Sequence, residues 1–315
     1  MERRAAGGSP IVACYREFEP HPALRSNVRA LFSFTPRAEP CPLRPITFEM
    51  RCAVGDACPS PMFADGNSSV VFDLGTIFHP GGTWRDSAAA IGGKVIGAMR
   101  RASSHSGRGL PAAVGAYLHP AQLSHVAHVP SREVTDRILP IEEVWGRSAS
   151  ELAERLAMLN ESTRLDLLEN VLLRQMAEPR ERGSAVDVRG LAVSVVRRGG
   201  RVSIDSLATA AGVSRQQLTR VFRERVGVSP KLYCRLARFQ SALAYARAGD
   251  SVDWARVACE VGYADQSHMI AEFRQFSSLT PHMLATQRWL HPFVERAKQA
   301  PTHQSLPLRL DSLRA

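Results

Sequence analysis

Residues 203–222 read SIDSLATAAGVSRQQLTRVF, and residues 253–273 read DWARVACEVGYADQSHMIAEF, so one pattern occurs twice, about 50 residues apart. In each copy an alanine stands four positions before a glycine, Gly212 or Gly262. A small side chain lets two helices cross closely, and glycine adopts the left-handed backbone of a tight turn most easily. The flanking apolar residues recur at helical spacing. The two stretches therefore predict two helix-turn-helix units.

Helix start signals agree with this interpretation. Ser203 and Asp253 are good N-cap residues, and Ser214, followed three residues later by glutamine, is typical of a capping box. Between the units, Pro230 suits the first turn of a helix, and apolar residues recur every three or four positions after it. We therefore expect one long helix over residues 230–246, which joins the units rigidly and fixes their spacing.

Three motifs carry a resemblance to a known family. They are Ala-x-x-x-Gly-Val-Ser-x-x-x-Leu-x-Arg-x-Phe at 208–222, Gly-Val-Ser-Pro at 227–230 and Gly-Tyr-x-Asp-Gln-Ser-His at 262–268. Together they resemble the DNA-binding domain of AraC/XylS-type bacterial transcription regulators, over about residues 185–290. The resemblance implies a seven-helix domain with both recognition helices on one face of double-stranded DNA, in a sequence-specific regulator of transcription.

The second helix of the first unit holds the main candidates for DNA contact. The resemblance assigns Gln216 and Arg220 to base edges, where glutamine and arginine make bidentate hydrogen bonds to adenine and guanine. Thr219 lies beside them, and Arg215 lies at the helix start, where residues enter the groove. Arg223 is expected at a phosphate, a contact that positions the protein without specifying a sequence. For each residue the alternative is a solvated surface side chain.

In the second unit, Gln266, Ser267 and His268 are the candidate base readers, and Arg274 is expected at the DNA backbone. Many relatives offer an arginine near position 271, but this chain has Ala271. We therefore expect the second unit to read bases less than the first.

Charge is also divided unequally between the units. The chain has 315 residues, with 40 Lys and Arg against 30 Asp and Glu, and its net charge of +10 favours a polyanionic partner. Residues 201–238 hold 8 basic and 2 acidic residues, whereas residues 250–288 hold 3 basic and 5 acidic ones. We expect the first unit to supply most of the phosphate attraction. The acidic second unit suggests a surface for a protein partner such as RNA polymerase.

The N-terminal part has a different character. Proline and glycine are frequent in residues 11–146, and short apolar runs at 69–74, 94–99 and 112–118 are typical of strands between turns. A weaker helical pattern covers residues 21–31. The expected fold class is α+β: a β-rich α+β domain with a sensor-like character, followed by an all-α C-terminal domain with two helix-turn-helix units joined by a long helix.

Residues 65–75 and 139–146 resemble the sensor-like N-terminal domain of one subgroup of these regulators. That resemblance implies a small-molecule effector or a role in forming a homodimer. Five aromatic residues are candidates for lining a ligand pocket, although aromatic residues in strands more often belong to the core. They are Phe72, Phe78, Trp84, Tyr117 and Trp145.

Leucine stripes predict helices at 149–159 and 162–177, which either form a dimer interface or pack back on the N-terminal domain. A charged stretch broken by proline and ended by glycine follows them and reads as a linker. The expected layout is a disordered N-terminus (1–10), the sensor-like domain (11–146), a helical connector (147–177), the linker (178–184), the DNA-binding domain (185–290) and a C-terminal tail (291–315).

The second hypothesis is an enzyme directed to DNA. Some relatives combine this DNA-binding domain with DNA repair by a zinc-bound cysteine, and Cys41, Cys52 and Cys58 are the only cluster that fits. Their spacing matches no standard zinc pattern, and the sequence has no Ser-His-Asp signature, phosphate loop or paired acids. We therefore expect no enzyme, no catalytic residue, no metal and no cofactor. Cys234 and Cys259 are expected to be small buried side chains in helices.

The N-terminal sequence has no uninterrupted apolar segment of the kind found in a signal peptide. No stretch approaches the roughly 18 apolar residues that a membrane span requires. These features indicate a cytoplasmic protein that has no membrane partner.

Overall fold

The computed structural model describes residues 12–37, 46–48, 60–79, 83–86, 91–105, 110–177, 186–245 and 252–286. The expected disordered N-terminus, the linker and the C-terminal tail lie outside the described residues, and so do Cys41, Cys52 and Cys58.

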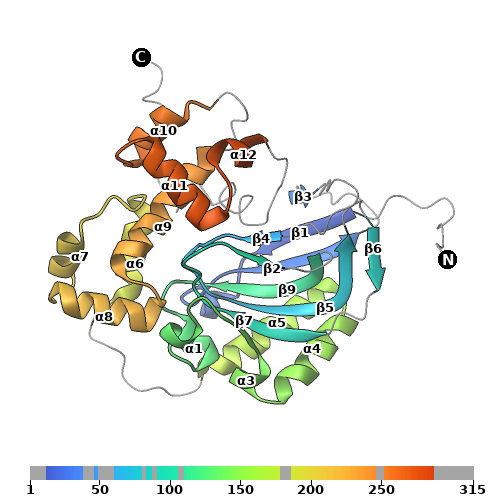
Figure 1. The fold of residues 1–315 in the computed structure, drawn as a ribbon. Coiled ribbons are helices and arrows are strands. Elements are labelled where there is room, and N and C mark those ends of the chain that lie inside the picture. Colours follow the sequence, from blue (N-terminus) through green and yellow to red (C-terminus); the bar gives the residue numbers. More distant parts are fainter. Residues whose placement is uncertain are drawn as a thin grey trace.

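An antiparallel sheet organises the N-terminal domain (Figure 1). Its described strands run in the order β10-β7-β5-β9-β2-β1-β3, and β6 pairs with β5. Their bounds are β1 Val12–Phe18, β2 Val28–Arg37, β3 Ile46–Phe48, β5 Ser69–His79, β6 Thr83–Asp86, β7 Gly92–Ile96, β9 Leu110–Leu118 and β10 Ile138–Pro140. The short strands β4 (Ser60–Met62) and β8 (Ser103–His105) pair separately. The three apolar runs that predicted strands coincide with β5, β7 and β9.

The helix expected at residues 21–31 is wrong. A short 3-10 helix, η1 (Pro22–Leu24), is followed at Val28 by the strand β2. Leu31 and Phe32 point to opposite faces of the sheet, as successive strand residues do, and both are buried. Because both faces of β2 are buried near this point, the strand lacks the alternation of apolar and polar residues by which a strand is recognised.

Five α-helices of the described N-terminal part come after β9: α1 Leu123–Ala127 and α2 Ser131–Val134 before β10, then α3 Glu142–Trp145, α4 Ser148–Met158 and α5 Glu161–Ala177. Helices α4 and α5 lie against one face of the sheet (Figure 1). Leu156 and Leu168 are fully buried in one core with Phe72 of β5. The leucine stripes therefore pack on the N-terminal domain instead of forming a free face for a second copy.

Phe72 and Trp145 belong to this core instead of lining a pocket, whereas Tyr117 is half-buried and lies outside it. Phe72 is fully buried, and the ring of Trp145 packs 6.1 Å from it while its Nε1 donates a hydrogen bond to the Val126 carbonyl. Tyr117 stacks on Phe32 at a centroid distance of 4.5 Å. The side chains of Phe78 and Trp84 lie outside the described part.

The described C-terminal part holds seven helices: α6 Val188–Arg197, α7 Ile204–Ala210, α8 Arg215–Val226, α9 Pro230–Leu243, α10 Trp254–Val261, α11 Gln266–Ser277 and α12 Pro281–Thr286. The expected signals hold: Ser203 and Asp253 cap α7 and α10 with their side chains, and Gly212 and Gly262 have φ angles of +64° and +84°. The chain is therefore an α+β protein with two helix-turn-helix units, α7–α8 and α10–α11, joined by α9.

Two faces of α9 belong to two different cores. Tyr233 and Ala237 pack with the first unit, whereas Leu236 and Phe239 pack with the second. The α-helix ends at Leu243, before the end of the expected 230–246 range, whose last residue lies outside the described part of the chain. Since both units are packed on α9, their relative placement is set by side-chain packing as well as by the connecting chain.

The N-terminal domain docks on both units through one end of its sheet. The chain that leaves β7 places Ala98 in the core of the first unit and the next residue, Met99, in the core of the second. At the second unit, the Ala64 amide donates to the Phe276 carbonyl at 2.8 Å, and the Ala102 amide donates to the Gln275 carbonyl at 3.1 Å. These contacts fall at the C-terminal end of α11.

A matching set of contacts holds the C-terminal end of α8. The Ser131 hydroxyl of α2 donates to the Arg225 carbonyl at 2.6 Å. The Thr135 hydroxyl, just after α2, donates to the Gly227 carbonyl at 2.9 Å. A Cβ atom built on Gly227 would lie 2.4 Å from the Thr135 Oγ1. The absence of a side chain at Gly227 therefore permits this docking.

Replacing Gly227 tests the docking. Gly212 and Gly227 both have a positive φ, +64° and +92°, but a Cβ on Gly212 would meet open space. Gly212→Ala should cost only the strain of a left-handed backbone, about 1–2 kcal/mol of unfolding free energy. Gly227→Ala should cost more, because its Cβ also displaces Thr135. Urea unfolding of the two variants beside the unmodified chain measures the difference, and equal losses would contradict the contact.

Candidate nucleic-acid interface

The first recognition helix, α8, has an apolar face that is buried and a polar face on the opposite side. Ser214 caps it by accepting a hydrogen bond from the Gln217 amide at 3.2 Å. Leu218 and Phe222 are fully buried against the other helices of the unit. A helix that is anchored along one side presents its opposite side to solvent. The side chains on that side are free to meet a ligand that approaches from solution.

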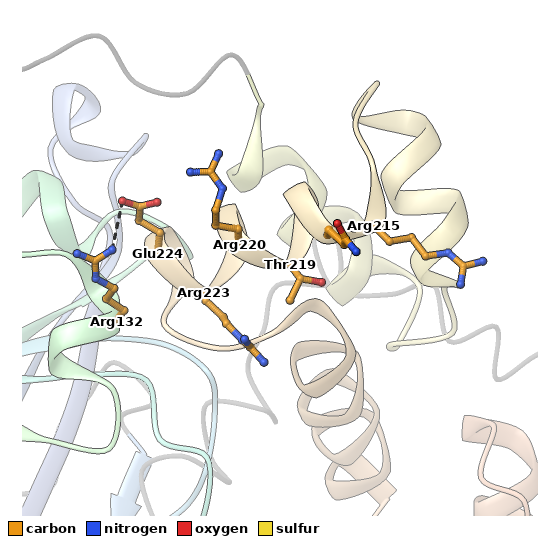
Figure 2. A pocket seen from close by; sticks show the side chains of 7 residues that line it. Arg132, Arg215, Thr219, Arg220, Arg223 and Glu224 are labelled. Atoms are coloured by element: carbon orange, nitrogen blue, oxygen red, sulfur yellow. Dashed lines mark ion pairs between the residues drawn. The ribbon is translucent and has the colours of Figure 1, made fainter.

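The predicted contact residues lie on this solvent side. Gln216, Arg220 and Arg223 are exposed, and Thr219 is half-buried between them. They line one surface groove together with two residues that the sequence did not single out, as Figure 2 shows. The groove residues are Arg132, Arg215, Gln216, Thr219, Arg220, Arg223 and Glu224.

Arg215 differs from its neighbours on α8. Its guanidinium forms an ion pair with Asp205 of α7, and in Figure 2 the side chain extends away from Arg220 and Arg223. Both partners of the pair are largely exposed, so the pair is weak in water. Arg215 therefore lies at the edge of the groove and must leave or share Asp205 in order to bind DNA.

Arg132 could not have been found from the sequence. It belongs to α2 in the N-terminal domain, far along the chain from α8, and no motif surrounds it. Only the docking of α2 against α8 brings it into the groove. Its Nη1 lies 3.6 Å from Glu224 Oε1 (Figure 2).

In the second unit, Asp265 caps α11, because its Oδ1 accepts a hydrogen bond from the His268 amide at 2.7 Å. The candidate readers Gln266, Ser267 and His268 are exposed in its first turn, and Arg274 is exposed two turns later. Ala271 also faces solvent. The exposed surface of α11 therefore holds fewer cations than that of α8.

The acidic surface expected on the second unit is smaller than its composition suggests. Asp253 and Asp265 are helix caps, and Glu260 pairs with Arg256 at 2.8 Å. Glu272, which is only 2% exposed, pairs with Arg235 of α9 at 2.6 Å. Glu272 is therefore not available to a partner, whereas Asp253 and Asp265 cap helices and stay exposed.

Glu272 is the centre of a polar cluster behind the recognition surface. The Arg235 guanidinium that binds it also donates to Gln275 Oε1 at 2.8 Å. The His268 Nε2 lies 3.5 Å from the Glu272 carboxylate, and the His268 ring meets Tyr263 edge to face. Burial, and secondly the charge of Glu272, raises the pKa of Tyr263. The cluster thus connects α9 to a candidate base reader.

Among the described residues, no three His, Cys, Asp or Glu side chains converge in a way that could hold a metal ion. Cys234 is buried as expected, and burial raises the pKa of its thiol to about 11. The expectation for Cys259 is wrong, because its side chain is exposed on α10. The apolar face of α10 is formed instead by Trp254, Val257 and Val261.

None of the helices in the described residues combines the length and the apolar character needed to cross a membrane.

Comparison with known proteins places a "Helix-turn-helix domain" family at residues 207–287 of this chain. An uncharacterized HTH-type transcriptional regulator of Haemophilus influenzae is 32% identical over 78 residues, which cover 25% of this chain. The match spans about a quarter (26%) of the length of that relative.

Among solved structures, ToxT from Vibrio cholerae is similar with a TM-score of 0.39 and 10% identity, over 72% of this chain and 91% of ToxT. A structure of the same protein described as unsaturated fatty acid bound has a TM-score of 0.35 and 11% identity, over 72% and 89% of the two chains.

The buried ion pair predicts that substitutions at two glutamates destabilise the protein by different amounts. Glu272→Gln should lower the free energy of unfolding by about 1.5–3 kcal/mol, since it weakens a charge-assisted hydrogen bond to Arg235. Glu260→Gln is the matched control: it removes a more exposed i,i+4 pair worth about 0.3–0.5 kcal/mol. Thermal or urea unfolding of both variants measures the contrast. Losses of equal size would show that the Glu272 pair adds nothing beyond a surface contact.

Proposed function

We propose, from the premise that residues 207–287 form an AraC-type helix-turn-helix domain, that the chain is a sequence-specific DNA-binding regulator of transcription. The observation that carries the proposal is the pair of recognition helices, α8 and α11, each anchored on α9 with its N-terminal polar turn exposed. In helix-turn-helix proteins the N-terminal residues of the recognition helix contact base edges in the major groove. The hydrogen bonds from the N-terminal domain reach the opposite ends of these helices, and the side chains of the N-terminal turns are exposed.

The two units have unequal roles in this proposal. Gln216 and Arg220 read base edges with Thr219 beside them, while Arg223 binds phosphate. Arg215 contributes once its pair with Asp205 opens. In the second unit Gln266, Ser267 and His268 meet the bases and Arg274 meets the backbone, with less affinity because no cation stands at Ala271.

The proposal also covers the other expected partners. In the second unit, the exposed Asp253 and Asp265 are the acidic side chains that a protein partner such as RNA polymerase would meet, because Glu272 is buried and Glu260 is paired. The α4 and α5 stripes are used inside the N-terminal domain, so a homodimer would need another surface. A small-molecule effector of the N-terminal domain, and a place in the cytoplasm, follow from the kind of protein proposed. No described feature favours the DNA-repair enzyme.

Selection from random DNA tests the function without knowledge of the target genes. The purified full chain is mixed with a random double-stranded library at near-physiological salt, and bound fragments are sequenced over several rounds. The proposal predicts a motif with two parts about one helical turn, or 10 base pairs, apart. Recovery of all sequences alike, with steep salt dependence, would contradict sequence-specific reading.

Arg220→Ala tests base reading by the first unit. The variant should lose about 1–3 kcal/mol of binding free energy at the selected site and should tolerate more bases at one position. Equilibrium binding to the selected site and to its single-base variants measures both effects. An unchanged preference at every position would remove Arg220 from the readers.

Arg223→Ala should behave differently, because a phosphate contact carries no sequence information. It should weaken binding to the selected site and to unrelated DNA by a similar factor, and should reduce the slope of log K against log [salt] by about 0.9. Titrations at several salt concentrations measure the slope. A loss confined to the selected site would instead make Arg223 a base reader.

A further inference from the structure

The groove along α8 contains one side chain from the N-terminal domain. Arg132 lies in α2, yet it lines the same groove as Gln216, Arg220 and Arg223 (Figure 2). Its side chain is 57% exposed, so a ligand in the groove can reach the guanidinium.

The position of Arg132 is fixed by its neighbours. Ser131 is 2% exposed and donates a hydrogen bond to the Arg225 carbonyl at 2.6 Å. Thr135 donates to the Gly227 carbonyl at 2.9 Å. Ser131 precedes Arg132 in the sequence and Thr135 follows it, so the two hydrogen bonds anchor the segment that carries Arg132 to the C-terminal end of α8. The guanidinium therefore stays beside α8 as long as the two domains remain docked.

The charge of the groove favours an anion. Four of its lining residues are arginines and one, Glu224, is a carboxylate. Arg132 faces Glu224 at 3.6 Å and Glu133 at 3.8 Å, and all three side chains are well exposed. Exposed ion pairs at such distances are weak in water. A phosphate group can therefore replace either carboxylate as the partner of Arg132.

We propose that Arg132 contacts a phosphate of DNA bound along α8, so that the N-terminal domain forms part of the DNA-binding surface. The inference rests on the proposed function and adds a residue and a domain to it. It also gives the N-terminal domain a direct influence on DNA affinity, because any movement of α2 away from α8 withdraws a phosphate contact.

The test measures the salt dependence of binding to the selected site by the full chain and three variants. Arg132→Ala should reduce the slope of log K against log [salt] by about 0.9, as expected for one lost phosphate contact. Its affinity deficit should therefore shrink about 3.5-fold over a fourfold rise in salt. Arg132→Lys should keep the slope, because it keeps the charge.

Arg137→Ala is the matched control. Arg137 is an exposed arginine of the same domain, its Nη1 donates to the Glu133 carbonyl, and it is not among the groove residues. Its loss removes the same net charge but should leave the slope unchanged. A similar fall in the slope for Arg137→Ala and Arg132→Ala would mean a general effect of net charge, and the proposed contact would be rejected.

The remaining outcomes also decide the matter. If the unmodified chain selects a motif but Arg132→Ala binds it with the same slope and affinity, the inference fails and the proposed function stands. Tighter binding by Arg132→Ala would also overturn it, because Arg132 would then hold the domains in a state that opposes DNA. If the unmodified chain shows no sequence preference, the proposed function fails, and the inference fails with it.

Discussion

The packing of α9 between two helix-turn-helix units is the constraint on which the rest of the molecule depends. Tyr233 and Ala237 face one unit, and Leu236 and Phe239 face the other. Phe239 also meets Phe273 and Phe276 of α11 at ring distances of 5.0 and 5.5 Å. Close-packed cores resist deformation, so α8 and α11 are held at one mutual placement.

The N-terminal domain reinforces this placement from a third side. Phe222 and Phe273 are the equivalent core phenylalanines of the two units, and the carbonyls three residues beyond them, of Arg225 and Phe276, both accept hydrogen bonds from the N-terminal domain. Ala98 and Met99 enter the two cores in sequence. The N-terminal domain thus contacts both recognition helices at corresponding points and leaves their first turns exposed.

The sequence predicted the parts of this arrangement that depend on local rules. Gly212 and Gly262 marked the turns because a left-handed backbone is a local requirement. Ser214 marked the start of the first recognition helix because a capping side chain reaches only the next turn. The strands β5, β7 and β9 were visible as apolar runs. The helix expected at 21–31 was wrong because β2 is buried on both faces and shows no alternation.

The features that could not be predicted from the sequence depend on contacts between segments that are distant along the chain. Glu272 was counted as surface charge, but Arg235 of α9 draws it into the interior. Arg132 carried no motif and enters the groove only through docking. Cys259 was expected inside because cysteine is usually buried. Its position on α10 depends on which face of the helix packs on the core, and Trp254 and Val257 occupy that face while Cys259 points to solvent.

One measurement tests the central claim, that α9 holds the two recognition helices at a fixed spacing. The affinity of the full chain is measured for its selected two-part site and for the same site with about 5 base pairs, half a helical turn, inserted between the parts. A rigid α9 predicts that the insertion reduces the affinity to that of either part alone, because the second part turns to the far side of the DNA. Equal affinity for both sites would show that the units move independently and would contradict the account.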